Sequence, residues 1–204
     1  MGGYLRDLLL EIPGKDYDFA LPKDAASFIE TIEEALRLHF FKVGKEEMNT
    51  TTYRIIKEDM SIDLTFLQGE TIEADLQRRD FTINTIAFFF QDETFHWMEG
   101  SLEDIEKKLI RTVSNHSIDQ DPLRMLRAIR YLCTLDGFVM DKGLKEEISL
   151  KKEKILSLPG ERRVWKTSAK MNITIWMSFP IPFSWLKKYH GLLNGLLGII
   201  KGFP

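Results

Sequence analysis

The chain has 204 residues, of which 44% are hydrophobic, so it is long and apolar enough to form one medium-sized domain and a smaller one. Its formal net charge of -3 excludes the strongly basic chain typical of many nucleic-acid binders, although a local basic groove stays open. The single cysteine excludes an internal disulfide, and no apolar run approaches the roughly 20 residues that a membrane span needs. We therefore expect a cytoplasmic protein without stable membrane association, and without a signal peptide because Arg6 and Asp7 interrupt the first apolar run.

The first twenty residues predict a phosphate-binding turn followed by a metal-binding strand. Gly2 and Gly3 form a turn with the basic Arg6 close behind it, and a strand is expected over residues 16–20. Because side chains alternate along a strand, Asp16 and Asp18 share one face. Mg²⁺ prefers such carboxylates together with substrate phosphates, which indicates a nucleoside-triphosphate site. An isolated Asp-x-Asp pair is more often a solvated strand edge, so the pair needs support from the rest of the chain.

The remaining residues predict a mixed α+β fold that gives way to helices. The apolar periodicity predicts helices over 8–11, 25–39, 71–78 and 81–86, strands over 40–43, 51–56 and 61–67, and a hairpin over 88–97. A polar loop at 44–49 separates the strands expected at 40–43 and 51–56. From residue 102 the period is helical throughout, over 102–109, 121–135 and 142–156. We expect a small sheet with flanking helices, followed by an all-helical segment.

Two further groups of polar residues come from this first part of the chain. Asp63 lies on the strand expected beside Asp16 and Asp18, where it could complete a carboxylate cluster or simply face solvent. The segment 78–84 begins with two arginines and Asp80, which could cap a following helix and create an anion site. Asn84 adds an amide one turn later. A capped surface helix with solvated arginines is the alternative.

A third group lies on the helix that begins at Asp121-Pro122. At 100° per residue, Asp121, Arg124 and Arg127 fall in a sector about 120° wide, and apolar residues fill the opposite side. Arginine offers a rigid fork of donors and aspartate offers acceptors, so this row could bind the edge of a base. An ordinary solvated helix face with i,i+3 ion pairs is the alternative.

Together, the segments 2–7 with 16–18, 78–84 and 121–127 resemble the motifs of the class II tRNA nucleotidyltransferases, or CCA-adding enzymes, which bacterial poly(A) polymerases share. The resemblance covers roughly residues 1–165. It implies a nucleotidyltransferase head with a palm sheet over 1–98 and a helical neck that reads the nucleobase over 99–165. An apolar, cationic tail of unknown role would occupy 166–204.

The resemblance also implies a role for each group. Asp16 and Asp18 would hold two Mg²⁺ ions, with Asp63 as a further catalytic candidate. Residues that meet the triphosphate, the ribose or the base would be Gly2, Gly3, Arg6, Arg78, Arg79, Asp80, Asn84, Asp121, Arg124, Arg127 and Arg130. Residues 99–113 would be a springy connector, and the loop at 44–49 would serve the switch from C to A addition.

The implied function is template-independent addition of CMP and AMP, from CTP and ATP, to the 3′ end of tRNA by a two-metal mechanism. Members of the family usually carry a helix and an apolar strand ahead of the glycine pair, whereas Met1 directly precedes it here. A truncated or degenerate relative that binds nucleotide or RNA without efficient turnover is therefore one alternative. A poly(A) polymerase is the other.

Overall fold

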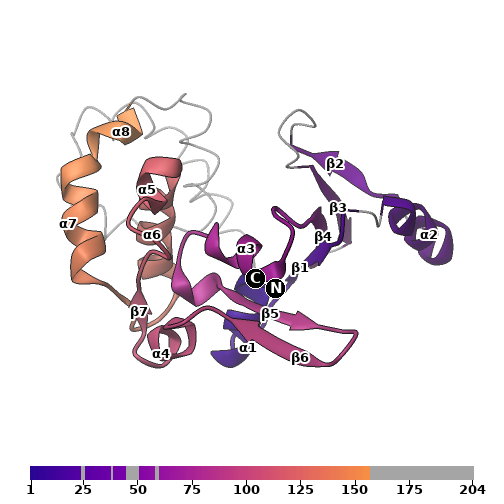
Figure 1. Ribbon diagram of the computed structural model, residues 1–204, viewed down its shortest axis with the longest axis horizontal. Helices are drawn as coiled ribbons and strands as arrows, with labels where there is room; N and C mark the ends of the chain where they lie inside the picture. The colour runs from indigo at the N-terminus through magenta and orange to yellow at the C-terminus, as the bar shows by residue number, and fades with distance from the viewer. Residues whose placement is uncertain (24–25, 38, 45–50, 58–59, 157–204) are drawn as a thin grey trace, which may run out of the picture. The chain divides into compact units, whose positions relative to one another are not determined.

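The computed structural model describes residues 1–23, 26–37, 39–44, 51–57 and 60–156. The chain divides into two compact units, Met1–Ser117 and Ile118–Pro204 (Figure 1). The segment 99–113, expected as a connector, belongs to the first unit. Most of the loop expected at 44–49, and the whole tail expected at 166–204, lie outside the described residues.

A four-stranded sheet organises the first unit, with the strand order β1-β4-β3-β2 (Figure 1). The strands are β1 (Asp16–Leu21), β2 (Phe41–Val43), β3 (Thr52–Lys57) and β4 (Met60–Phe66). β1 pairs with β4 in parallel, whereas β4–β3 and β3–β2 are antiparallel. Parallel neighbours need a long crossover, and α2 (Ala26–Leu36) lies within it. The predicted α+β class and these four strands are confirmed.

Short helices and a hairpin complete this unit. α1 (Gly3–Leu9) packs against β1 and against a hairpin of β5 (Ile86–Phe89) and β6 (Thr94–Trp97). Phe88 and Phe95 face each other across the hairpin, with ring centroids 4.7 Å apart, as expected for a stabilising cross-strand aromatic pair. The unit also contains α3 (Ile72–Gln77), α4 (Ser101–Glu106) and β7 (Leu109–Ile110). A small core cluster joins α3 to the hairpin through Ile72, Leu76 and Ala87.

The helix predicted over 81–86 is wrong. The chain forms only a 3-10 turn, η2 (Thr82–Asn84), before β5 begins. The Thr85 hydroxyl donates to the Thr82 carbonyl at 2.6 Å, a local bond that competes with helical hydrogen bonding. β-branched residues at 82, 83, 85 and 86 also disfavour a helix, because they lose side-chain freedom against the preceding turn.

The second unit is mainly helical. It contains most of α5 (Ser117–Gln120), then α6 (Leu123–Thr134), β8 (Val139–Met140), α7 (Lys142–Lys151) and α8 (Glu153–Leu156). The expectation of helices alone is wrong, because Gly137, with φ +75°, and the Asp141 cap leave a short extended link between α6 and α7. The helix predicted over 142–156 is divided at residue 152.

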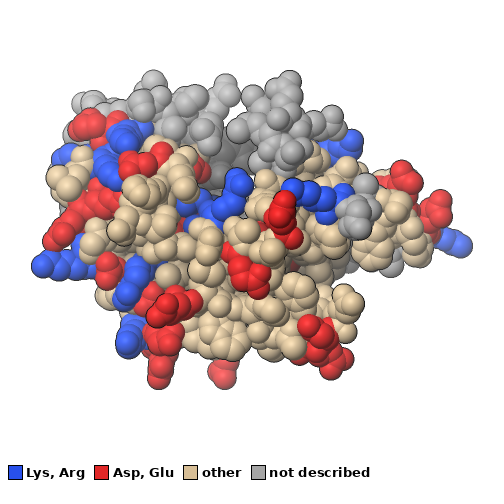
Figure 2. All heavy atoms as spheres, viewed as in Figure 1, with Lys and Arg blue, Asp and Glu red and all other residues tan. Residues whose placement is uncertain are grey.

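Helix length and surface charge are two further properties of the described residues. None of the helices in the described ranges is long and apolar enough to cross a membrane. Acidic and basic side chains are intermingled on the face drawn in Figure 2. This mixed surface agrees with the small net charge of -3.

Candidate functional site

The predicted acidic pair lies on β1. The alternation of side chains along this strand puts Asp16 and Asp18 on one face, opposite Ser61 and Asp63 of β4 in the strand register. The Ser61 hydroxyl donates to Asp16 Oδ1 at 2.8 Å. On the other face, the Tyr17 ring packs against Tyr4 of α1 with a centroid separation of 4.7 Å. The strand is thus fixed by packing on one side and presents carboxylates on the other.

The Asp18 carboxyl is in an electrostatically unfavourable place. Burial raises the pKa of Asp18 above its ordinary value, and the carboxylates of Asp63 and Asp16 raise it further. The positive charges of the Met1 amino group and Arg79 oppose this increase in the pKa. Hard oxygen ligands that share a face and repel one another fit a divalent cation, and Mg²⁺ commonly takes only one or two carboxylates in addition to substrate phosphates.

The Asp63 carboxylate forms an ion pair with an arginine of the neighbouring strand. The carboxylate is held by the guanidinium of Arg54 on β3, with Arg54 Nε donating to Asp63 Oδ1 at 2.6 Å and a second, shorter bond joining Nη2 to Oδ2. Within the described ranges, no three carboxylate, imidazole or thiol groups lie close enough together to hold a metal. In this structure the forked ion pair with Arg54 holds the third carboxylate, and a role for Asp63 beside Asp16 and Asp18 stays a prediction.

The glycine turn contacts β5 and the side chain of Arg79. Gly2 has φ +59°, a conformation that glycine adopts without strain, and its amide donates to the Ile86 carbonyl at 2.8 Å. A Cβ at Gly2 would lie 2.3 Å from Arg79 Nη1, so the guanidinium lies directly over the turn. Gly3 begins α1 and has 3.7 Å of clearance at the same position. Of the two glycines, only Gly2 is required by this geometry.

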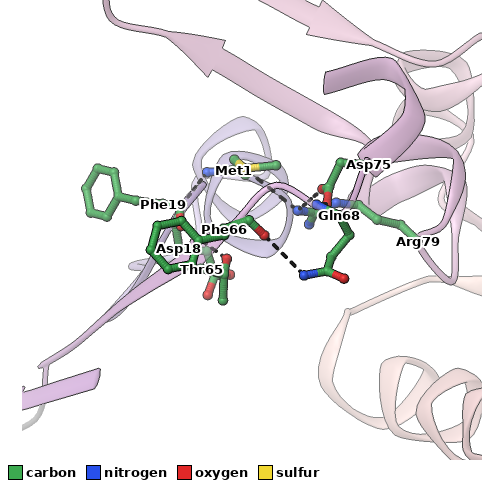
Figure 3. A network of polar contacts seen from close by, with 8 residues as sticks. All are labelled: Met1, Asp18, Phe19, Thr65, Phe66, Gln68, Asp75 and Arg79. Atoms are coloured by element: carbon green, nitrogen blue, oxygen red, sulfur yellow. Dashed lines mark hydrogen bonds and ion pairs between the residues drawn. The ribbon is translucent and has the colours of Figure 1, made fainter. Parts of the chain in front are cut away.

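Arg79 is held at this turn by several groups. Its Nη2 lies 3.2 Å from Asp75 Oδ2 and 3.8 Å from the sulfur of Met1. Figure 3 shows Met1 bonded both to Arg79 and, through its amino group, to the Asp18 carbonyl at 2.8 Å. Asp75 was missed by the sequence analysis. It lies on the helix predicted over 71–78, and its i,i+4 spacing from Arg79, one residue beyond that helix, was a signal that could have found it.

Arg6 and Asn84 join two of the predicted motifs inside the protein. The side chain of Arg6 is only 7% exposed, and its Nη1 donates to Asn84 Oδ1 at 2.6 Å across 78 positions of sequence. Its Nε and Nη2 donate to Asp7 Oδ1 at 2.8 and 2.6 Å. Asn84 in turn donates to Asp80 Oδ1 at 2.9 Å. This buried chain of bonds fixes α1 against η2, so the geometry favours positioning over direct phosphate contact for Arg6.

The residues just before Asn84 in the segment 78–84 differ from expectation in one respect. The predicted cap by Asp80 is wrong, because the 3-10 turn begins after Phe81 and has no side-chain cap. Asp80 Oδ1 instead accepts from the Phe81 amide at 2.9 Å. Asp80 is buried, whereas Arg78 is exposed and half-buried Arg79 faces the glycine turn. Of the two arginines, only Arg78 fits a surface role.

The other predicted residues lie in the second unit: Asp121 lies just before α6, and the arginines lie on α6. Pro122 immediately precedes the first helical residue, and Asp121 Oδ1 accepts from the Leu123 amide at 3.2 Å. Half-buried side chains form the polar side of this segment: Asp121, Arg124, Arg127 and Arg130. The opposite side is buried and consists of Leu123, Met125, Leu126, Ala128, Ile129 and Tyr131. The predicted division of this helix into an apolar face and a charged face is confirmed.

Comparison with known proteins identifies similar chains. The family model for the Poly A polymerase head domain matches residues 1–111. The CC-adding tRNA nucleotidyltransferase of Shouchella clausii is 32% identical over 165 residues, which is 80% of this chain and 41% of that protein. Poly(A) polymerase I of Salmonella typhi is 32% identical over 156 residues, 67% of this chain and 34% of its own length.

Solved structures agree with these sequence relatives. The Thermotoga maritima CCA-adding enzyme complexed with tRNA superposes with a TM-score of 0.65 at 29% identity, covering 84% of this chain and 42% of that one. A CCA-adding enzyme in complex with ATP gives a TM-score of 0.67 at 29% identity, covering 84% and 43%. The chain therefore spans less than half the length of these relatives.

Proposed function

Since the chain belongs to the Poly A polymerase head-domain family, we propose that it is a nucleotidyltransferase that adds CMP and AMP, from CTP and ATP, to the 3′ end of tRNA. One observation carries the proposal. The paired carboxylates of Asp16 and Asp18 lie on one strand face, and Arg79, whose charge acts on Asp18, lies over the glycine turn. An anionic nucleotide and a cation need these two opposite charges close together.

The charges of the side chains in the first unit determine the role of each in this proposal. Asp16 and Asp18 would hold two Mg²⁺ ions, which when bound lower the pKa of the RNA 3′-hydroxyl and stabilise the pyrophosphate leaving group. Arg79 donates hydrogen bonds to the triphosphate and orients it, with the exposed Arg78 beside it. The hydrogen bonds that join Arg6 to Asn84 and Asn84 to Asp80 fix the glycine turn relative to the segment 78–84. Positioning and charge neutralisation supply most of the rate in such a reaction.

The second unit supplies base recognition in this proposal. Asp121, just before α6, and Arg124, on α6, bind the edge of the incoming cytosine or adenine, and Arg127 and Arg130 lie on the same helix as Arg124. The buried apolar face of α6 fixes the helix, so its guanidinium groups are presented from a rigid element. A rigid donor fork suits a planar base edge better than a flexible ammonium group does.

A second function, poly(A) synthesis, is favoured by one specific observation. The Salmonella typhi relative is a poly(A) polymerase, and it is as similar to this chain, at 32% identity, as the CC-adding relative. The two functions use the same residues of the first unit and differ in the number and kind of nucleotides added. Product length and composition therefore distinguish them.

The test is incorporation of labelled CTP and ATP into tRNA that lacks its 3′ terminus, in the presence of Mg²⁺. Asp16→Ala should reduce incorporation by on the order of 10²–10³-fold, the loss typical for one preorganised electrostatic group. Glu30→Ala, which removes an exposed acid from α2, is the matched control and should retain activity. Equal incorporation by wild type and Asp16→Ala would refute the enzymatic proposal. Nucleotide binding without incorporation by the wild type would favour a relative that does not turn over.

A further inference from the structure

We propose that Asp75 is a positioning residue that holds the guanidinium of Arg79 over the glycine turn, so that the arginine is oriented before the nucleotide binds. The inference rests on the proposed function in one respect, namely that Arg79 meets the triphosphate. Asp75 itself lies on α3 and has no role in the chemistry. It acts only through its neighbour.

Both carboxylate oxygens of Asp75 are engaged, and they point to different parts of the chain. Oδ1 accepts from the Gln68 amide at 3.1 Å, just after the end of β4. Oδ2 lies 3.2 Å from Arg79 Nη2 (Figure 3). The side chain of Asp75 is 12% exposed, so water competes weakly for these bonds. The carboxylate is thereby fixed to the segment after β4 and provides a rigid anchor for Arg79.

The other terminal nitrogen of the Arg79 guanidinium lies against Gly2. Nη1 occupies the space that a Cβ at Gly2 would need, and Nη2 also approaches the sulfur of Met1 at 3.8 Å. Arg79 is close enough to Asp18 for its charge to oppose the rise in the pKa of that carboxyl. Asp75 on one side and the bare backbone of Gly2 on the other therefore determine where this positive charge lies.

A free arginine side chain samples many rotamers, and a ligand that orders it loses affinity. An arginine already ordered by Asp75 avoids that loss. Asp75→Asn should therefore raise the KM for ATP and CTP roughly three- to tenfold, the range expected for immobilising one flexible side chain. The value of kcat should change by less than about twofold, because a contact kept equally in the ground and transition states affects KM alone.

The direction of the change in KM distinguishes a positioning role of Asp75 from a purely electrostatic effect of its charge. Removing a carboxylate near a polyanion site should tighten nucleotide binding if only the local charge matters. Positioning predicts weaker binding. Glu73→Gln removes the same charge from the same helix at a 56% exposed position, and it is the matched control with an expected change in KM below twofold.

A double-mutant cycle tests whether Asp75 acts through Arg79. The increase in KM caused by Asp75→Asn should disappear in an Arg79→Gln background. Asp75→Glu, which restores the charge, should recover part of the affinity. An unchanged or lowered KM in Asp75→Asn, or an increase that persists in the Arg79→Gln background, would overturn the proposal.

A second measurement does not depend on turnover. A dicarbonyl reagent modifies accessible guanidinium groups, and mass spectrometry separates the modification of Arg79 from that of its exposed neighbour Arg78. In Asp75→Asn, Arg79 should react several times faster than in the wild type, with Arg78 unchanged. Equal rates at Arg79 in the two proteins would overturn the inference. A wild type without transferase activity would refute the proposed function, while the reactivity of Arg79 would still decide the role of Asp75.

Discussion

Replacement of Gly2 by alanine should both destabilise the first unit and displace Arg79. Gly2 has φ +59° and ψ -121°, a region that side-chain-bearing residues enter at a cost of about 1–3 kcal/mol. The new methyl group would also lie 2.3 Å from Arg79 Nη1, far inside van der Waals contact. The end of an arginine side chain can move aside, so we expect the backbone to account for most of the lost stability. We also expect Gly2→Ala to bind nucleotide more weakly, because the guanidinium is displaced.

The adjacent glycine provides the control for stability. Gly3 is the first residue of α1, and a Cβ there would find its nearest neighbour, Arg6 Nη2, at 3.7 Å. Alanine is favoured over glycine in a helix by up to about 1 kcal/mol, so Gly3→Ala should be neutral or stabilising. The two substitutions add the same methyl group at neighbouring positions. Only Gly2→Ala should nevertheless lower the free energy of unfolding.

Urea unfolding of the two variants and the wild type measures this difference directly, provided that the m-values agree. Nucleotide affinity, measured in the same preparations, should fall in Gly2→Ala. A loss of stability below about 0.5 kcal/mol in Gly2→Ala, the range of a neutral surface substitution, would refute the conformational reasoning. Equal losses in the two variants would refute it as well, because they would show that the methyl group matters and the backbone conformation does not.

Three further predictions follow from burial and charge. Because the pKa of Asp18 is raised above its ordinary 3.8, its ionised form costs stability at neutral pH, so Asp18→Asn should melt at a higher temperature than the wild type in metal-free buffer. That difference should narrow as the pH falls toward about 4, and Mg²⁺ should stabilise only the wild type. Asn84→Ala should cost about 1.5–3 kcal/mol in urea unfolding, since Arg6 stays buried with one acceptor fewer; a neutral result would contradict a structural role for this bond. Met125→Ala, at a fully buried site of α6, should lower the free energy of unfolding by about 2–5 kcal/mol. Leu150→Ala, at an 83% exposed site of α7, should change it by no more than about 0.5 kcal/mol in the same assay. Similar losses in the two variants would contradict the assigned packing.

The sequence alone was sufficient for the elements in which the spacing of polar and apolar residues decides the outcome. The strand at Asp16–Leu21, the hairpin of β5 and β6 and the apolar face of α6 all follow from the spacing of polar and apolar residues. The same reasoning failed over 81–86, where apolar residues suggested a helix. There, β-branched residues and side-chain bonds to the backbone produce a single 3-10 turn and then a strand.

The sequence by itself thus determined which residues carry the charge at this site and which face of each element they occupy. Only the tertiary structure decided which partner each charge meets. Arg6 binds Asn84 across 78 positions, Asp63 is held by Arg54 from the adjacent strand, and Arg79 lies over Gly2. The physical reason is that periodicity within an element records only whether a side chain faces the core or the solvent. The partner of a buried or half-buried charge depends on strand register and on packing between segments far apart in the chain.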